Sequence, residues 1–371
     1  MSTIRVDEIV DALGTGTPNF PNGIVINNVP LREGILDPEN RIINGAFDFW
    51  QRGTSSTSFG YVAADRWRQA PIGGTVTQSR QAHTIGDKFG SNNPAFYLRQ
   101  TVSGQSAANN IAITQHRIEG VRSYAGETIT ILGWARRSSG SGNMAIEAEQ
   151  DFGTGGSPSA AINAIGPTTI TLASSWQPFV AVIAIPSITG KTLGTNGNDF
   201  VAVNFWASAG SDSNARTNSL GIQIIGVDLW GIHIKVGTHT TDAVSLYKQP
   251  ELGPELARCQ RYYQTSYPIG VAVQAYTNVT DGASFISINT SDTSNGGPLP
   301  VSMRATPAFA VYSSNGGVGA NSARDGGGGG NVTGITLFGG TTNNLPRLSK
   351  AAGLGTQGAP YTAHWTADAE L

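Results

Sequence analysis

Apolar and polar residues alternate along much of the chain, which is typical of half-buried β-strands. Alternation or an unbroken β-rich run covers TITILGWAR (128–136), MAIEAEQDF (144–152), QPFVAVIAI (177–185), DFVAVNFWA (199–207) and LGIQIIGVDLWGIHIKVG (220–237). Clusters of Gly, Asn and Ser separate these segments, and no long helical period lies between them. The pattern predicts a β-sandwich of the jelly-roll kind over residues 41–247.

The first 40 residues follow a different pattern. A helical spacing of i, i+3, i+4 and i+7 connects four apolar residues, Val6, Ile9, Val10 and Leu13. This spacing predicts a short amphipathic helix, with a strand over 3–10 as the alternative. The sequence GTGTPNFPNG follows and is typical of a turn or an extended linker. We therefore expect residues 1–40 to form an N-terminal arm and linker.

A second helical segment, GPELARCQRYYQ (253–264), has Pro254 at a position suited to the first helical turn. The residues expected on one face of this helix are Leu252, Leu256, Cys259 and Tyr263. Shorter β-rich segments follow and predict a smaller C-terminal β-sandwich over 266–371, with 248–265 as a helical connector. The whole chain is therefore expected to be all-β, with one short helix between two β-domains.

Composition supports a loop-rich β-protein and excludes several functional classes. Charged residues make up 13% of the 371 residues, and 48 residues are glycine. The net charge of −2 gives no electrostatic footprint for nucleic acid, and no apolar run is long enough for membrane insertion. Cys259 is the only cysteine, so an internal disulfide is excluded. The N-terminus lacks the features of a signal peptide, so we expect synthesis in a host cytoplasm.

Aromatic residues are concentrated in NGAFDFWQRGTSSTSFGYVAADRW (44–67). Read as a strand, this stretch places Phe47 and Phe49 on one side and Asp48 and Trp50 on the other. Buried tryptophans are large contributors to β-sheet cores. We therefore expect the large aromatic residues here to fill a core rather than to bind sugar: Phe47, Phe49, Trp50 and Trp67.

Better glycan-binding candidates lie on the polar faces of predicted strands. Asn204 and Trp206 lie opposite Val201 and Val203, and Trp134 shares a face with threonines. An indole ring beside hydrogen-bonding groups suits a pyranose ring. The candidate set is Trp134, Glu149, Asn204 and Trp206, with subunit contact or partial burial as the alternative.

Carboxylates and histidines give no catalytic constellation. Glu147, Glu149 and Asp151 alternate along one strand face, about 7 Å apart, which is compatible with a glycosidase pair. Catalytic carboxylates usually face each other from different strands, so we expect a solvated face or a cation site instead. The glycine run 326–330 lacks the Lys-Ser/Thr of a phosphate loop, and no HExxH motif is present. We predict no catalytic residue, no metal and no cofactor.

Several blocks occur in one order along the chain: IRVDEIVDALGTGTPNFPNGI, NGAFDFWQRGTS with AADRW, ELARCQRYYQ, and ADAEL. Together they resemble phage tail-fibre and related virion proteins whose jelly roll is similar to carbohydrate-binding modules. The resemblance implies a non-enzymatic homotrimer in the virion. It also implies attachment of the arm to tail or neck/head proteins, with Val6, Ile9, Val10, Leu13 and Phe20 as candidate contacts. One departure is HIKVG, where such jelly rolls usually close with Gln-Leu-Glu before Val-Gly.

The sequence thus predicts a structural fibre protein of a phage virion, most simply a tail fibre. Binding of host-surface polysaccharide is an additional hypothesis. The alternatives are a polysaccharide-degrading tailspike, a capsid or head fibre, or a decoration protein. A free carbohydrate-binding module of a secreted enzyme is a further alternative, which the missing signal peptide disfavours.

Overall fold

The structure, a computed structural model, describes residues 40–275, 282–316, 318–326, 328–350, 354 and 357–371, together with two short strands nearer the N-terminus. The chain divides into two compact units, Met1–Asp37 and Pro38–Leu371. In the first unit, β1 (Val25–Ile26) pairs antiparallel with β2 (Val29–Pro30). The predicted attachment residues of the arm lie outside the described residues: Val6, Ile9, Val10, Leu13 and Phe20.

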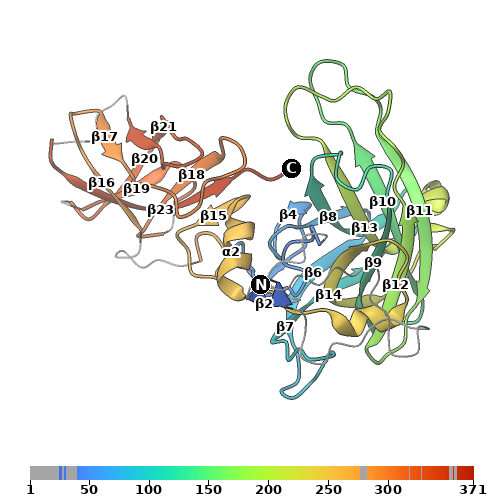
Figure 1. Ribbon diagram of the computed structural model, residues 1–371. Helices are drawn as coiled ribbons and strands as arrows, with labels where there is room; N and C mark the ends of the chain where they lie inside the picture. Colours follow the sequence, from blue (N-terminus) through green and yellow to red (C-terminus); the bar gives the residue numbers. More distant parts are fainter. Residues whose placement is uncertain are drawn as a thin grey trace, which may run out of the picture. The chain divides into compact units, whose positions relative to one another are not determined.

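The second unit contains a sandwich of two six-stranded antiparallel sheets, labelled in Figure 1. Sheet 1 has the order β11 (Ile162–Thr171), β10 (Asn143–Asp151), β13 (Phe200–Ala209), β8 (Ile111–Glu119), β5 (Trp67–Ile72), β4 (Gly60–Tyr61). Sheet 2 has the order β12 (Gln177–Ala184), β9 (Thr128–Ser139), β14 (Gly226–Val236), β7 (Phe96–Ser103), β6 (Thr75–Ala82), β3 (Ser55–Ser56). The jelly-roll prediction is confirmed, and four of the five predicted strands match their observed bounds closely. The fifth begins only at Gly226, not at Leu220.

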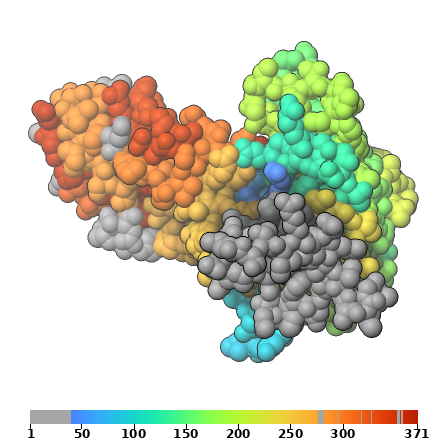
Figure 2. Space-filling view, in the orientation of Figure 1, coloured from blue at the N-terminus to red at the C-terminus, as the bar shows by residue number. Residues whose placement is uncertain are grey.

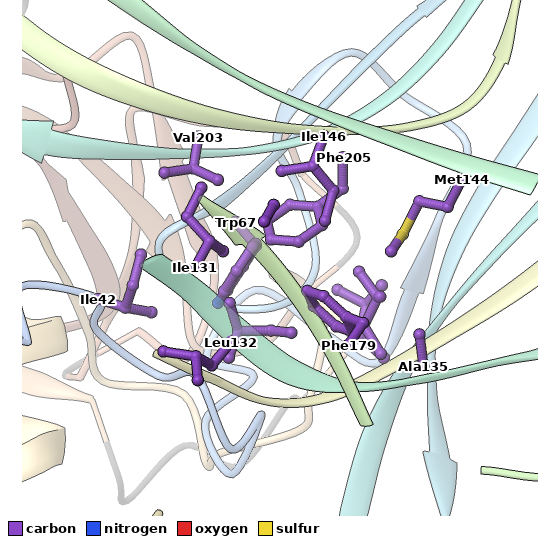
Figure 3. Packing of buried hydrophobic residues seen from close by; sticks show 14 of the residues in the cluster. Ile42, Trp67, Ile131, Leu132, Ala135, Met144, Ile146, Phe179, Val203 and Phe205 are labelled. Atoms are coloured by element: carbon purple, nitrogen blue, oxygen red, sulfur yellow. The ribbon is translucent and has the colours of Figure 1, made fainter. Parts of the chain in front are cut away.

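The core lies between the two sheets and follows from the period-two alternation of each strand. Phe205 of β13 and Phe179 of β12 have ring centroids 6.3 Å apart, and Val203 of β13 lies above Ile131 of β9 in Figure 3. Met144 and Ile146 of β10 add to the same layer. A residue with a Cβ cannot replace Gly133 of β9 without movement, since that Cβ would lie 2.6 Å from the Ile232 side chain. Side chains from the two neighbouring strands of sheet 2, Ile232 of β14 and Phe179 of β12, therefore fill the space over this glycine.

Phe47, Trp50 and Trp67 of the stretch 44–67 fill this core, as predicted, and Phe49 is buried in a separate cluster with Ile43 and Cys259. Phe47, Trp50 and Trp67 are each 0% exposed, and Phe49 is 6% exposed. The predicted strand is wrong, because residues 44–54 form turns and irregular backbone, with Phe47 at a φ of +58°. The indole of Trp50 donates to the Phe47 carbonyl oxygen at 2.6 Å, which holds the turn closed. A strand would have pointed Phe47 and Trp50 to opposite sides, whereas the turn buries both side chains.

Asp48 in this stretch gives a pH-dependent prediction. Burial raises the pKa of its carboxyl group to about 6, although Gln249 donates to both of its oxygens. Below pH 4 the carboxyl group is protonated in both the folded and the unfolded state. As the pH rises towards 6, the group ionises more readily in the unfolded state, so the free energy of unfolding falls. We expect Asp48→Asn to raise the free energy of unfolding at pH 7 by about 2 kcal/mol. We also expect it to flatten the stability profile between pH 4 and pH 6, measured by urea unfolding.

Few helical segments interrupt the described strands: η1 (Ser211–Ser213), α1 (Asn214–Thr217), η2 (Thr241–Leu246) and α2 (Leu252–Gln260). The connector helix is shorter than predicted, because the chain turns after Gln260 and Tyr263 begins strand β15 (Tyr263–Thr265). The predicted apolar face is wrong at Leu252, which is 58% exposed, and right at Cys259, which is buried.

The C-terminal part is also all-β, with two sheets around a small core. Strand β23 (Pro360–Asp368) is central and pairs with β15 and with the following strands: β16 (Ala283–Ile286), β18 (Ala308–Ser313) and β19 (Ser322–Asp325). Strand β20 (Asn331–Thr333) pairs with β19. A three-stranded sheet has the order β17 (Asp292–Asn295), β22 (Arg347–Ser349), β21 (Thr336–Phe338). Phe285, Val311, Leu348 and Tyr361 form the centre of this core.

Candidate functional site

Three of the four predicted glycan-binding residues come together on the outer face of sheet 1. Glu149 lies on β10, and Asn204 and Trp206 lie on the adjacent strand β13. Asn204 Nδ2 donates to Glu149 Oε2 at 3.4 Å. Trp134 is not part of this group, because it lies on β9 of sheet 2.

A row of polar side chains crosses sheet 1 at this point, perpendicular to its strands. The strand register places Tyr61, Arg68, Gln115, Asn204 and Glu147 opposite one another on five adjacent strands. Gln115 Nε2 donates to Asn204 Oδ1 at 2.8 Å, and Asn204 Nδ2 donates to Glu147 Oε1 at 3.2 Å. We call these five residues the polar row.

At one end of the polar row, Arg216 of α1 binds both glutamates of β10. Its guanidinium lies 2.5 Å from Glu147 Oε1 and 2.9 Å from Glu149 Oε2. It also lies 5.0 Å from the ring centroid of Trp206, over the indole face. Trp206 is 1% exposed, so its ring cannot stack on a sugar while Arg216 is in place.

The carboxylates of β10 are therefore structural in this arrangement. Glu147 has a side chain that is 0% exposed, so the expected solvated face is wrong at this residue. Burial raises the pKa of Glu147, while Arg216 and Asn204 oppose that rise. The Glu147 carboxylate also accepts a hydrogen bond from the Ala164 backbone at 2.8 Å.

Arg216→Met is expected to lower the free energy of unfolding by about 3 kcal/mol at pH 8, because Glu147 would remain buried without its cation. A carboxyl group whose folded pKa is raised favours folding at low pH and disfavours it as pH rises. The deficit should therefore shrink towards pH 4, measured by urea unfolding across pH. Arg122→Met, at an exposed arginine, is the control. A deficit that does not change with pH would show that Glu147 is not the cause.

The other end of the polar row is basic and more accessible. Arg68 NH1 and Arg117 Nε both donate to Gln115 Oε1, at 3.2 Å and 2.8 Å. The Arg68 guanidinium lies 4.2 Å from the ring centroid of Phe59, which is 62% exposed. Here an exposed aromatic ring lies next to a guanidinium group.

Trp134 lies on the outer face of sheet 2 in a separate aromatic cluster. Its ring centroid is 5.3 Å from Trp230 and 5.6 Å from Phe89. The loop containing Phe89 covers the cluster, and Trp134 is 7% exposed. Burial lowers the pKa of His83 in this loop to about 4, so the ring is neutral at pH 7. Trp134 is therefore packed in an apolar layer under its loop.

A buried ion network connects blocks from both ends of the second unit. Arg66 pairs with Glu370, and Arg52 NH2 lies 3.1 Å from Asp368 and 3.2 Å from Glu370. Arg52 NH1 also lies 3.8 Å from Asp65. We call these five residues the junction.

Two tyrosines that follow α2 cover the arginines of the junction. The Arg66 guanidinium lies 3.5 Å from the ring centroid of Tyr262, and that of Arg52 lies 3.6 Å from Tyr263. The Arg66 side chain is 1% exposed and that of Arg52 is 7% exposed. The opening stretch, the segment after α2 and the end of β23 are thus tied together by charge and ring contacts.

Two long loops extend from sheet 1 beyond the polar row. Residues 152–159 and 192–196 are joined by backbone hydrogen bonds, such as Gly194 N to the Phe152 carbonyl at 2.7 Å. In the space-filling view of Figure 2, these loops belong to the green to yellow-green region at the top.

Within the described residues, no group of three or more His, Cys, Asp or Glu side chains could hold a metal ion. In the same part of the chain, no helix is both long and apolar enough to cross a membrane.

Sequence reasoning missed Arg68, Gln115, Arg117 and Arg216. Gln115 and Arg117 have polar neighbours, Thr114 and His116, in ITQHRIEG, so alternation with apolar residues did not mark their face. Only the pairing of distant strands reveals that these side chains meet.

Comparison with known proteins gives no family. No protein-family profile and no curated protein matches the chain. Among solved structures, it is similar to the enzymatically active domain of tailspike protein 4 of bacteriophage CBA120, at 12% identity and a TM-score of 0.31. That match covers 53% of this chain and only 21% of the tailspike.

Two further similar structures have names that refer to sugar binding. One is a sugar-binding protein of Bacteroides thetaiotaomicron, at 14% identity and a TM-score of 0.33, covering 53% of this chain and all of that one. The other is a carbohydrate-binding module in complex with β-1,4-galactotriose, at 9% identity and a TM-score of 0.27, covering 53% and 99%. These likenesses are too distant to carry an argument about function.

Proposed function

We propose that this chain is a structural fibre protein of a phage virion, anchored by its N-terminal arm, and that its jelly roll binds host-surface glycan without catalysis. A tail fibre is the simplest form of this proposal. The partners are two further copies of the chain in a homotrimer, and tail or neck/head proteins that hold the arm.

The observation that carries this proposal is the junction. The residues of the junction come from NGAFDFWQRGTS with AADRW and from ADAEL, and the two tyrosines that cover it come from ELARCQRYYQ. All three are blocks that resemble virion fibre proteins. Segments more than 300 residues apart meet there, as in the pair of Arg66 with Glu370. The resemblance therefore lies in one cooperative structural element rather than in unrelated short matches. A buried network of this kind suits a part that transmits load.

The tie between Arg216 and the two glutamates supports a role without catalysis. A general acid must exchange a proton with substrate, and a nucleophile must reach the anomeric carbon. Glu147 and Glu149 instead hold one shared cation, and Glu149 is also bound by Asn204. Opening this site for chemistry would require the removal of Arg216.

Glycan binding is assigned to the outer face of sheet 1. The basic end of the polar row offers the half-buried guanidinium of Arg68, and Phe59 adds an exposed ring. Sugars are bound by this combination of flat apolar surface and directional polar groups.

The test of the structural role is removal of residues 1–25 from the chain during phage assembly. We expect the truncated protein to fold, with an unchanged circular dichroism spectrum, and to be absent from purified virions. Attachment of the truncated protein to virions would overturn the assignment of the arm. Oligosaccharide released from host polysaccharide, and abolished by Glu149→Gln, would instead favour the tailspike alternative.

A further inference from the structure

The two ends of the outer face of sheet 1 differ in charge balance. At the β10 end, Arg216 is bound by two carboxylates. At the other end, Arg68 and Arg117 converge on a neutral acceptor, the amide oxygen of Gln115. Among the described residues, no carboxylate side chain lies within salt-bridge distance of either arginine. The basic end therefore carries two cations whose shared acceptor is uncharged, although the charge of Glu149 also acts on Arg68.

The environments of the two arginines differ. Arg117 NH1 donates to a main-chain oxygen of Leu371 at 2.7 Å, and its guanidinium lies 4.2 Å from the ring centroid of Phe200. Arg68 is half-buried, and burial together with the charge of Arg117 lowers its pKa. Two cations held this close are stabilised when an anion binds between them.

A comparison within the same molecule shows that this arrangement is unusual. On sheet 2, Arg99 and Arg136 also converge, but there the buried carboxylate of Asp228 lies 2.6 Å and 2.9 Å from their Nε atoms. The Asp228 carboxylate thus opposes the charge of Arg99 and Arg136 without any ligand. On sheet 1, Arg68 NH1 and Arg117 Nε converge on one amide oxygen, where sheet 2 has a carboxylate.

Phe59 supplies the second part of a sugar site. One side of its ring faces the Arg68 guanidinium at 4.2 Å, and the side chain is 62% exposed. A pyranose ring stacks on such a surface, and a carboxylate on that sugar would lie within reach of a neighbouring guanidinium.

We propose that Phe59, Arg68, Gln115 and Arg117 bind an acidic pyranose, with the sugar carboxylate held by the two guanidinium groups and the ring stacked on Phe59. This inference rests on the proposed glycan-binding function and specifies its substrate class as acidic polysaccharide. Gln115 positions the arginines through its amide oxygen, while Arg216 pairs with the neighbouring carboxylates, Glu147 and Glu149.

The test is affinity electrophoresis of the full chain through gels that contain a carboxylate-bearing polysaccharide. Polygalacturonate, alginate, hyaluronan and polysialic acid serve as probes, each beside its carboxyl-reduced neutral form. We expect retardation by at least one acidic polymer and none by its neutral form. Arg68→Gln should weaken binding about tenfold, as expected for loss of a charge-assisted hydrogen bond. Phe59→Ala, at an exposed position, should weaken it without loss of folding.

Arg80→Gln is the matched control, because Arg80 on sheet 2 also lies over a phenylalanine ring, at 4.4 Å from the centroid of Phe96. An equal loss in Arg80→Gln would show non-specific charge attraction and overturn the proposal. Binding that survives carboxyl reduction and Arg68→Gln would overturn the acidic-sugar inference and leave glycan binding in place. No retardation by any polymer, together with no binding to host cells, would remove the glycan-binding function itself.

Discussion

Trp67→Ala is expected to lower the free energy of unfolding by about 4 kcal/mol, the largest effect of any single substitution considered for this chain. Trp67 is fully buried, and its ring lies 4.9 Å from Phe47, 5.0 Å from His116 and 5.8 Å from Phe205. Its indole nitrogen also donates to the Asn44 carbonyl oxygen at 3.0 Å. Alanine would leave a cavity between the sheets and an unsatisfied acceptor in the opening turn.

The measurement for Trp67→Ala is urea unfolding followed by tryptophan fluorescence and circular dichroism. Phe59→Ala is the control, since an exposed ring should change stability by no more than about 0.5 kcal/mol. A cost for Trp67→Ala as small as that of the control would contradict the assignment of this aromatic stretch to the core.

Glu370→Ala is expected to lower the free energy of unfolding by about 3 kcal/mol, because Arg66 and Arg52 would lose their buried partner. Arg66 is almost fully buried. Without Glu370 its guanidinium would keep the hydrogen bond from NH2 to the Arg117 carbonyl oxygen, at 2.6 Å. We also expect the single unfolding transition to separate into two, since the junction couples the two β-parts.

Asp368→Asn is the matched control for Glu370→Ala. Asp368 contacts the same Arg52, but its side chain is 43% exposed, whereas that of Glu370 is 6% exposed. Exposed ion pairs contribute at most about 1 kcal/mol. Equal effects of the two substitutions, measured by calorimetry, would contradict the view that burial makes the junction cooperative.

The strands of the jelly roll were predictable because their side chains alternate with a period of two. Met144, Ile146, Val203 and Phe205 all point inwards as the sequence pattern indicates. The burial of Phe47, Phe49, Trp50 and Trp67 was also predictable from the aromatic content of their stretch. Its turn structure was not, since the left-handed backbone at Phe47 and the cap by Trp50 depend on tertiary contacts.

The candidate site was only partly predictable. Alternation placed Asn204 and Glu149 on outward faces correctly, but it gave no information on what covers those faces. Arg216 comes from a short helix in a loop, and its pairing with Glu147 across 69 positions has no local signal in the sequence. The convergence of Arg68 with Arg117 likewise depends on the register between β5 and β8. Pairing of distant strands thus decides which polar residues form a site.

The most direct measurement is electron microscopy of purified virions labelled with an antibody against the jelly roll. The account predicts labelled fibres on the virion, with three copies of the chain in each fibre. Virions that carry no label, while the protein is found free as a monomer in lysates, would contradict it.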